Sequence, residues 1–97
     1  MRLIWSPLAV TRMKQIVEYI SLDDPKAAQN WANNVFAKTD ALETSPKMGR
    51  VVPEINRSNL RELIYGNYRI IYQISKESID ILTVRNARQE FLASEVE

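Results

Sequence analysis

The sequence predicts an α+β fold, in which a short strand and an antiparallel pair of helices precede a three-stranded antiparallel meander. Two stretches with apolar residues at the helical period each begin with a capping side chain and a proline, at Ser6-Pro7 and Asp24-Pro25. Only three or four residues separate these stretches, which favours a helical hairpin. Three strand-like runs follow, with hairpin-sized connections of two and three residues.

The first half of the chain is predicted to form the strand and both helices. Residues 2–6, RLIWS, alternate weakly between apolar and polar side chains and end where the first helix begins. A helix over 7–21 has one apolar face formed by Ala9, Met13, Ile16, Val17 and Ile20. A helix over 25–44 has one apolar face formed by Ala28, Trp31, Ala32, Val35, Thr39 and Leu42. Trp5 and Trp31 are therefore predicted to be packing residues.

The second half is predicted to form a loop and the meander. Pro46, Gly49 and Pro53 break the helical period over residues 45–54, where Val51 and Val52 suggest a brief extended piece. Strands are predicted at 60–65, 68–74 and 78–85, joined at Gly66-Asn67 and at residues 75–77. We expect a single domain over residues 1–97, with residues from about 90 onward as a C-terminal tail.

The segment NYRIIYQI, residues 67–74, carries an arginine in an otherwise largely apolar strand. Alternation puts Tyr68, Ile70, Tyr72 and Ile74 on one face and Arg69 on the other. If the helices cover the tyrosine and isoleucine face, the opposite face is open or partly covered by the tail. We expect Arg69 to lie there and Arg61, from the preceding strand, to share that face.

Composition limits the chemistry that is available. The chain has 97 residues, 45% of them hydrophobic and 26% charged, and it contains neither cysteine nor histidine. Disulfides and thiolate metal sites are therefore excluded, as are histidine ligands and a histidine base. We expect no cofactor and no metal. No apolar run is long enough for a membrane span, and a cytoplasmic location is the expectation.

The positive charge is concentrated in the second half of the chain. The net charge is only +1, but residues 47–88 contain eight basic and four acidic side chains. Six of the eight are arginines: Arg50, Arg57, Arg61, Arg69, Arg85 and Arg88. Guanidinium groups bind phosphates and carboxylates in bidentate geometry, so either nucleic acid or an acidic protein is a suitable partner.

The order of elements, together with GRVVPE, LRELIYGNYRIIYQI and ILTVRNARQ, resembles the RelE/ParE superfamily of bacterial type II toxin-antitoxin modules. The resemblance covers residues 2 to about 90. One sheet and one amphipathic hairpin already predict that the helices pack on one face of the sheet, and the resemblance implies that a cognate antitoxin neutralises the chain. RelE-like members are ribosome-dependent mRNA endoribonucleases, whereas ParE-like members arrest growth by inhibiting DNA gyrase and serve in plasmid stabilization.

The resemblance carries only part of a nuclease site. Arg69 matches the phosphate-stabilising arginine of the RelE-like pattern, and Arg61 matches a basic position of the preceding strand. A further lysine is replaced by Leu63, and the C-terminal tyrosine finds at best Phe91. Metal-free RNA cleavage needs a base, an acid and fixed positive charge, for which Glu54 is a conceivable base. Tyr65 and Tyr72 are conceivable acids without a motif behind them.

This incomplete set favours the ParE-like, gyrase-directed interpretation, with the RelE-like nuclease using Arg61 and Arg69 as the alternative. A non-toxic protein-binding domain is a third possibility. The residues expected to bind the antitoxin or the target are Arg50, Arg61, Arg69, Arg85 and Arg88. Structural interpretations remain open: Arg69 pairs with Glu62 or Asp80, and Arg85 and Arg88 protect the sheet edge.

The expected partners are a cognate acidic antitoxin and DNA gyrase, with the ribosome and mRNA as the alternative target. No membrane partner is expected, and DNA is expected to be bound only through the antitoxin. An antitoxin segment with apolar and acidic side chains would suit an apolar hairpin surface and a basic concavity opposite to it.

Overall fold

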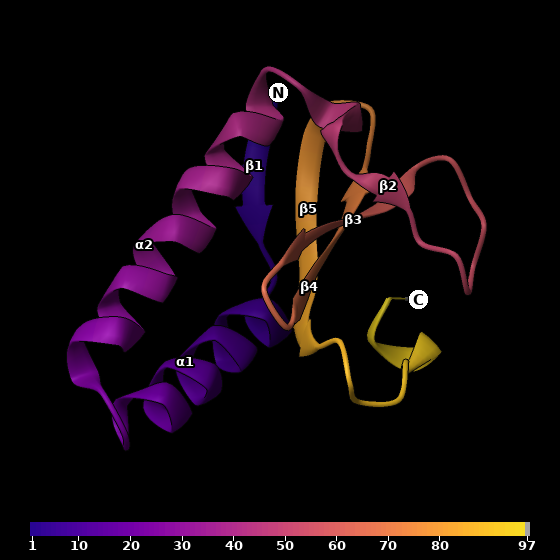
Figure 1. The fold of residues 1–97 in the computed structure, drawn as a ribbon. Helices are drawn as coiled ribbons and strands as arrows, with labels where there is room; N and C mark the ends of the chain where they lie inside the picture. The colour runs from indigo at the N-terminus through magenta and orange to yellow at the C-terminus, as the bar shows by residue number, and fades with distance from the viewer. Residues whose placement is uncertain (97) are drawn as a thin grey trace.

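A computed structural model describes residues 1–96, and it has the predicted α+β architecture (Figure 1). The elements, in chain order, are β1 (Arg2–Trp5), α1 (Pro7–Ser21), α2 (Pro25–Asp40), β2 (Arg50–Val51), β3 (Leu60–Tyr65), β4 (Tyr68–Ile74) and β5 (Ser78–Asn86). Single 3-10 turns occur at Ala41–Glu43, Pro46–Met48 and Ala93–Glu95.

Both helices begin at the predicted caps. The Ser6 hydroxyl accepts a hydrogen bond from the Ala9 amide at 3.0 Å, and it donates to the Leu82 carbonyl at 2.9 Å. The start of α1 is therefore tied to β5. Asp24 accepts from two amides at the start of α2, both at 3.1 Å. The predicted helix over 25–44 was too long, because its last turn narrows to the 3-10 turn Ala41–Glu43.

The five strands form one sheet in the order β1-β5-β4-β3-β2. Strands β3, β4 and β5 form the predicted antiparallel meander, and β1 adds to its edge parallel to β5. Strand β2 pairs with β3 one residue earlier than the extended piece predicted at 51–52. A bulge in β5 lies opposite Ile71 and Tyr72.

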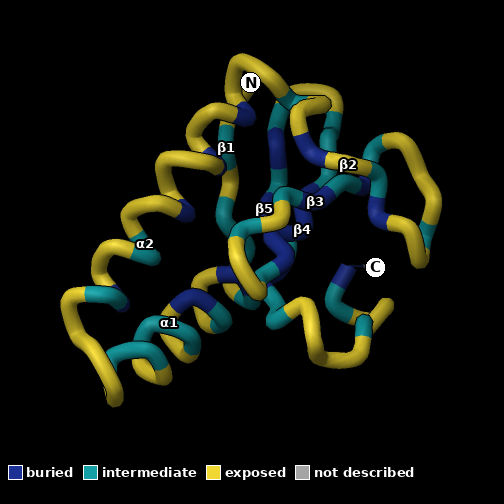
Figure 2. The backbone as a smooth tube through the Cα atoms, viewed as in Figure 1, coloured by how far each residue is buried: buried dark blue, intermediate teal, exposed yellow. Residues whose placement is uncertain are grey.

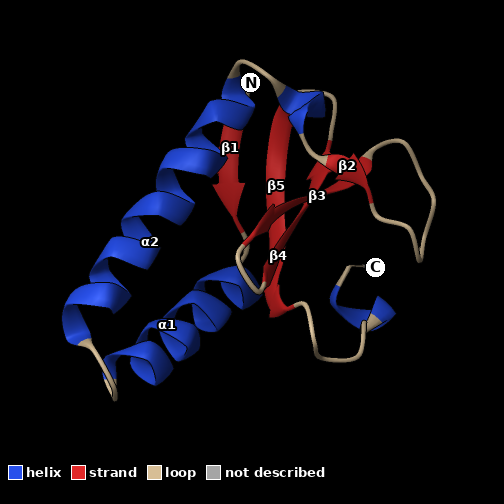
Figure 3. Ribbon diagram, in the orientation of Figure 1, coloured by secondary structure: helices blue, strands red, loops and turns tan. Residues whose placement is uncertain are grey.

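The helices cover one face of the sheet, as predicted (Figure 3). Between the layers lies a core whose buried members include Ala9, Met13, Val35, Leu42, Ile70, Tyr72, Ile79, Ile81 and Val84. Trp31 packs edge-on against Tyr68 with ring centroids 5.0 Å apart, and Trp5 packs against Phe36 at 5.4 Å. Both tryptophans therefore have the predicted packing role.

The other face of the sheet is covered too, although the sequence predicted that it would be open or only partly covered by the tail. The loop after β2 and the C-terminal tail lie on this side, away from the helices (Figure 2). Together with the sheet they form a second small core of Val52, Leu60, Ile71 and Val96, with Ile55, Leu82 and Phe91 packed around it. We refer to this side as the tail face and to the opposite side as the helix face.

Candidate functional site

The expectation that Arg61 and Arg69 share a face is wrong. Residues directly opposite each other in an antiparallel pair point to the same side of the sheet. Arg61 is opposite Tyr72, on the helix face, whereas Arg69 is opposite Ile64, on the tail face. The two-residue turn at Gly66-Asn67 sets this register, since it pairs Tyr65 with Tyr68. The two arginines do not form one basic surface.

Arg69 is buried, with 8% of its surface exposed, and two carboxylates occupy its guanidinium group. Its Nε donates to Glu62 Oε1 at 2.6 Å, and its two terminal nitrogens donate to Glu54 at 2.8 Å each. Arg50 donates to the other Glu62 oxygen at 2.7 Å. We call these four side chains the Arg69 network. It contains two positive and two negative charges, and the ring of Phe91 lies 5.2 Å from the Arg69 guanidinium carbon.

The electrostatics of the network oppose a catalytic role for Glu54. The hydrogen bond from Arg69 is the main cause that lowers the pKa of Glu54 below 4.5, although burial acts in the opposite direction. The hydrogen bond to Glu54 raises the pKa of Arg69 further. A general base near neutral pH needs a pKa near the working pH and a free oxygen. Glu54 has neither in this arrangement.

Arg61 contacts the loop that follows β2 and the loop that precedes it. Its Nε donates to the Ser58 carbonyl and its Nη1 to the Gly49 carbonyl, both at 2.9 Å. Tyr72 holds the loop that precedes β2, because its hydroxyl donates to the Pro46 carbonyl at 2.7 Å and accepts from the Gly49 amide at 3.0 Å. Arg61 and Tyr72 therefore both bind the backbone of the loop before β2.

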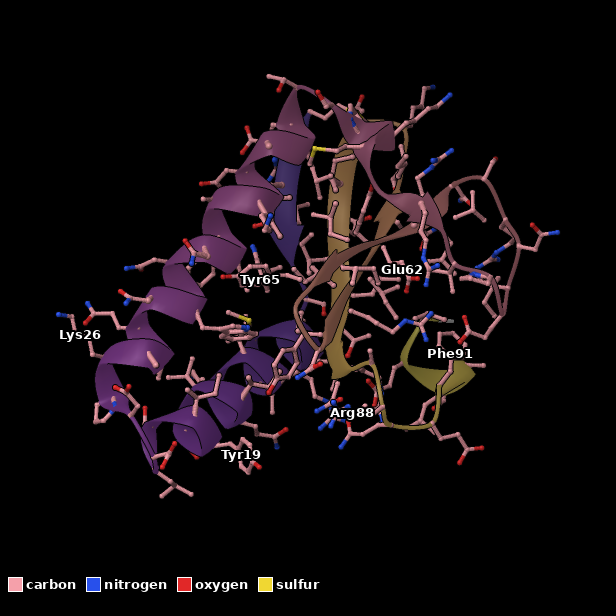
Figure 4. All side chains as sticks on the ribbon, viewed as in Figure 1. Tyr19, Lys26, Glu62, Tyr65, Arg88 and Phe91 are labelled. Atoms are coloured by element: carbon pink, nitrogen blue, oxygen red, sulfur yellow. The ribbon has the colours of Figure 1, made fainter. Side chains whose placement is uncertain are left out.

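The two tyrosines considered as acids are both engaged. Burial raises the pKa of Tyr72 and outweighs the lowering effects of the Gly49 amide and of Arg61. The Tyr65 hydroxyl accepts a hydrogen bond from Asn34 at 2.9 Å, and Lys38 lies over its ring. Figure 4 shows Tyr65 toward the helices, on the other side of the sheet from Glu62 and Phe91. Neither tyrosine lies beside Arg69 as a leaving-group acid would.

Arg85 forms a second ionic cluster with the tail. Glu95 accepts from Arg85 and Arg12 at 2.7 Å each through one carboxylate oxygen, and from the Thr83 hydroxyl at 2.7 Å through the other. We call these four side chains the Glu95 clamp. Arg88, by contrast, is exposed in the turn after β5 (Figure 4). Of the five predicted binding arginines, Arg50, Arg69 and Arg85 point to the tail face.

Arg12 and Glu95 were not identified from the sequence as residues that contact each other at the tail face. Arg12 lies on α1, 83 positions from Glu95, and the two meet only because the tail folds back over the sheet. The sequence of the tail contains a signal nonetheless. Phe91, Glu95 and Val96 combine apolar and acidic side chains, which suits a sheet face with arginines and isoleucines.

The Glu95 clamp predicts a pH-dependent contribution to stability. Burial alone would raise the pKa of Glu95, but hydrogen bonds from Arg12 and Thr83 and the charge of Arg85 lower it below 4.5. A carboxylate with a lowered folded-state pKa stabilises the fold fully above its unfolded value and loses this effect as the pH falls. At pH 7 we expect Glu95→Gln to lower the free energy of unfolding by about 1–3 kcal/mol.

Urea unfolding of both proteins between pH 7 and pH 3 measures this contribution. The difference between wild type and Glu95→Gln should shrink below pH 4.5, the ordinary value for glutamate. Glu90→Gln is the matched control, because Glu90 is an exposed glutamate of the same tail. A difference that stays constant down to pH 3 would show that the charge of Glu95 does not hold the tail.

Two surface depressions adjoin these elements. An apolar groove of about 390 Å³ on the helical hairpin is lined by Trp5, Val10, Met13, Lys14, Val17, Glu18, Ala32 and Phe36. A polar cleft of about 570 Å³ between α1 and the end of β5 is lined by Arg12, Gln15, Ile16, Tyr19, Tyr68, Val84, Arg85, Asn86 and Gln89. We refer to them as the hairpin groove and the α1–β5 cleft.

Residues 1–96 contain neither a metal-binding cluster nor a membrane-spanning helix. No group of three or more acidic, cysteine or histidine side chains lies together as a metal site would require in this range. No helix in the same range is long and apolar enough to cross a membrane. In the Arg69 network and the Glu95 clamp, the arginine and glutamate side chains form ion pairs with one another.

Comparison with known proteins gives matches of three kinds. Residues 3–91 match the family model of the ParE toxin of the type II toxin-antitoxin system parDE. A curated relative from Sinorhizobium fredii (strain NBRC 101917 / NGR234), named "Putative toxin Y4kP", is 37% identical over 92 residues, which is 93% of this chain and 92% of the relative. A solved structure titled "Chromosomal ParDE TA system from P. aeruginosa" has a similar fold, with a TM-score of 0.72 at 19% identity. The match covers 89% of this chain and 95% of that one.

Proposed function

The chain belongs to the ParE toxin family of type II toxin-antitoxin systems, and we propose that it arrests growth by inhibiting DNA gyrase and is neutralised by a cognate antitoxin. The family membership is the premise. The gyrase target comes from the ParE-like branch that the sequence resembles. The organisation of the arginines supports this branch against the RelE-like one.

The observation that carries the proposal is the Arg69 network. In a metal-free nuclease, the arginine must offer its donors to the scissile phosphate. In this chain the Arg69 donors bind Glu54 and Glu62, and only 10% of the Arg69 side chain is exposed. Arg61, the second candidate, lies on the opposite face. This arrangement supports a toxin that acts by binding.

The hairpin groove is the surface that we propose for the apolar part of the antitoxin. Its lining is mostly aliphatic and aromatic, and Val10 and Phe36 are 39% and 44% exposed. Lys14 and Glu18 are the polar side chains at its border. An amphipathic helix that places its apolar face in a groove is a common mode of peptide recognition. Acidic side chains of the same antitoxin are expected to contact exposed arginines such as Arg88.

If the antitoxin binds in the hairpin groove, the Val10→Glu toxin should escape neutralisation by the antitoxin. The substitution places an unpaired charge where the antitoxin buries apolar side chains, so the affinity should fall roughly tenfold or more. Glutamate is a good helix former, and Val10 is an exposed residue of α1, so the fold should be retained. The measurement is binding of the antitoxin to the purified toxin variant, together with growth during co-expression.

Met48→Glu is the control for this variant. Met48 is an apolar side chain with 50% exposure, it lies outside the hairpin groove, and its substitution introduces the same charge. We expect Met48→Glu to bind the antitoxin as wild type does. Equal affinities for Val10→Glu and Met48→Glu would place the antitoxin elsewhere.

The proposed target is tested by inducing the toxin in cells without antitoxin and following two readouts together. We expect gyrase-trapped DNA and a DNA damage response, with messenger RNA intact. Codon-phased cleavage of translated messages within minutes, without trapped gyrase, would replace the proposal by the nuclease activity. Unaffected growth would replace it by a non-toxic binding domain.

A further inference from the structure

The α1–β5 cleft is unused by the proposed function, and its lining combines three kinds of side chain. Arg12 and Arg85 provide positive charge, Tyr19 and Tyr68 provide aromatic rings, and three amide side chains come from Gln15, Asn86 and Gln89. None of the lining side chains is acidic. With a volume of about 570 Å³, the cleft is within the range of sites for small ligands.

One face of α1 builds the helical wall of the cleft. Arg12, Gln15, Ile16 and Tyr19 are spaced by three and four positions, so they point to the same side of the helix. The opposite wall comes from the last residues of β5, whose pairing with β1 ends at Ile81. The cleft therefore lies between α1 and the part of β5 beyond the end of the β1–β5 ladder.

The Glu95 clamp fixes the arginines of the cleft without closing it. Glu95 binds one terminal nitrogen of each guanidinium, and Arg12 Nη1 donates to Gln15 at 3.0 Å. Arg12 Nε is buried and has no hydrogen-bond partner within residues 1–96. Within residues 1–96, two arginines share one carboxylate at the cleft, so these three side chains together carry a net positive charge. The adjoining turn adds the exposed Arg88.

Tyr19 provides an aromatic surface at the border of the cleft. It is 71% exposed, which is unusual for a large aromatic side chain. Tyr68 is half-buried deeper in the cleft, where its ring packs on Trp31. An exposed ring beside arginines is the arrangement that stacks a nucleobase while the phosphate is neutralised.

We propose that the α1–β5 cleft binds one nucleotide unit, with its phosphate at Arg12, its base against Tyr19 and its polar edges at the amide side chains. Arg85, with only 13% of its side chain exposed against 30% for Arg12, adds positive charge without contacting the phosphate. An acidic peptide would use the arginines but would leave the ring and the three amides without a specific role. The nucleotide can belong to a single strand of DNA or be free in solution. Binding to a single strand would give the chain a direct contact with DNA, in contrast to the expectation that DNA is reached only through the antitoxin, whereas binding to a free nucleotide would not.

Fluorescence anisotropy with a labelled single-stranded DNA of eight nucleotides tests the proposal on the purified full chain. Tyr19→Ala should weaken binding about 5- to 100-fold, because each stacked base contributes strongly to such affinities. Leu22→Ala is the control, since Leu22 is 88% exposed near the end of the same helix but does not line the cleft. Arg12→Gln should reduce the slope of log affinity against log salt by about one.

Two competitors identify the source of the nucleotide. Displacement by a deoxynucleoside monophosphate supports a site that accepts a free nucleotide. Displacement by the unlabelled strand alone supports a site that requires neighbouring phosphates. Unchanged binding in Tyr19→Ala, or equal displacement by a glutamate octapeptide, would overturn the proposal and leave the cleft as a carboxylate site. The measurement contains no gyrase, so its failure is separate from a failure of the proposed function.

Discussion

Replacement of Arg69 by methionine is expected to lower the free energy of unfolding by about 3–5 kcal/mol, because it leaves a buried carboxylate without its main partner. Glu62 has no exposed side-chain surface, and its two hydrogen-bond partners are Arg69 and Arg50. Arg50 is 60% exposed and contacts only one of the Glu62 oxygens. A domain of this size has a total stability of about 5–10 kcal/mol, so the variant should be close to unfolding.

The companion substitution Glu62→Leu should restore much of this loss. Replacing both partners of a buried ion pair by apolar side chains is often nearly neutral, whereas removing one partner is costly. Arg50 and Glu54 keep access to water, with side chains 60% and 40% exposed. We therefore expect Glu62→Leu/Arg69→Met to be at least about 2 kcal/mol more stable than Arg69→Met in urea unfolding.

Arg57→Met is the control for the lost charge. Arg57 is an exposed arginine in the loop that also carries Glu54, and such surface substitutions change stability by about 0.5 kcal/mol or less. A double variant as unstable as the sum of its single variants would contradict the interpretation, because it would mean that Arg69 and Glu62 do not depend on each other.

The second large effect is expected at Gly49, where Gly49→Ala should cost about 2–3 kcal/mol. A Cβ atom there would lie 2.6 Å from the Glu62 carbonyl oxygen and 2.7 Å from the Tyr72 hydroxyl. Neither atom is free to move. The β2–β3 pairing holds the Glu62 backbone, and the Tyr72 hydroxyl is bound to the Gly49 amide and the Pro46 carbonyl.

Gly66→Ala separates this crowding from backbone strain. Gly66 has a φ of +57°, and a Cβ atom added to it would meet no other atom within 4 Å. Its substitution therefore costs only the strain of the left-handed conformation, about 1–2 kcal/mol. The melting temperature of Gly49→Ala should be the lower of the two. The reverse order would show that the loop before β2 adjusts and that Tyr72 does not fix it.

Most of the fold could be predicted because local signals agree with tertiary structure. The caps at Ser6 and Asp24 and the helical period give both helices. The alternation in residues 68–74 gives β4 and correctly separates Arg69 from the tyrosines. The position of β1 was not predicted, because its pairing with β5 joins residues about 76 positions apart and leaves no local pattern.

The candidate site was predicted less well, although the sequence contains the turn that determines which residues share a face. A two-residue turn at Gly66-Asn67 fixes which residues are opposite each other, and applying it would have placed Arg61 with Tyr72 and Glu62 beside Arg69. The family pattern instead suggested that both arginines act together. The Glu95 clamp is harder to predict, because it depends on how an irregular tail folds over the sheet.

The most direct test of the account is growth arrest by Glu62→Leu/Arg69→Met, the variant in which the fold is expected to survive without Arg69. If the proposed function is correct, cells that express it without antitoxin should stop growing and accumulate gyrase-trapped DNA, as with wild type, because Arg69 is proposed to stabilise the fold and not to act on RNA. A variant that is folded by circular dichroism yet harmless, while wild type cleaves translated messages, would contradict the account.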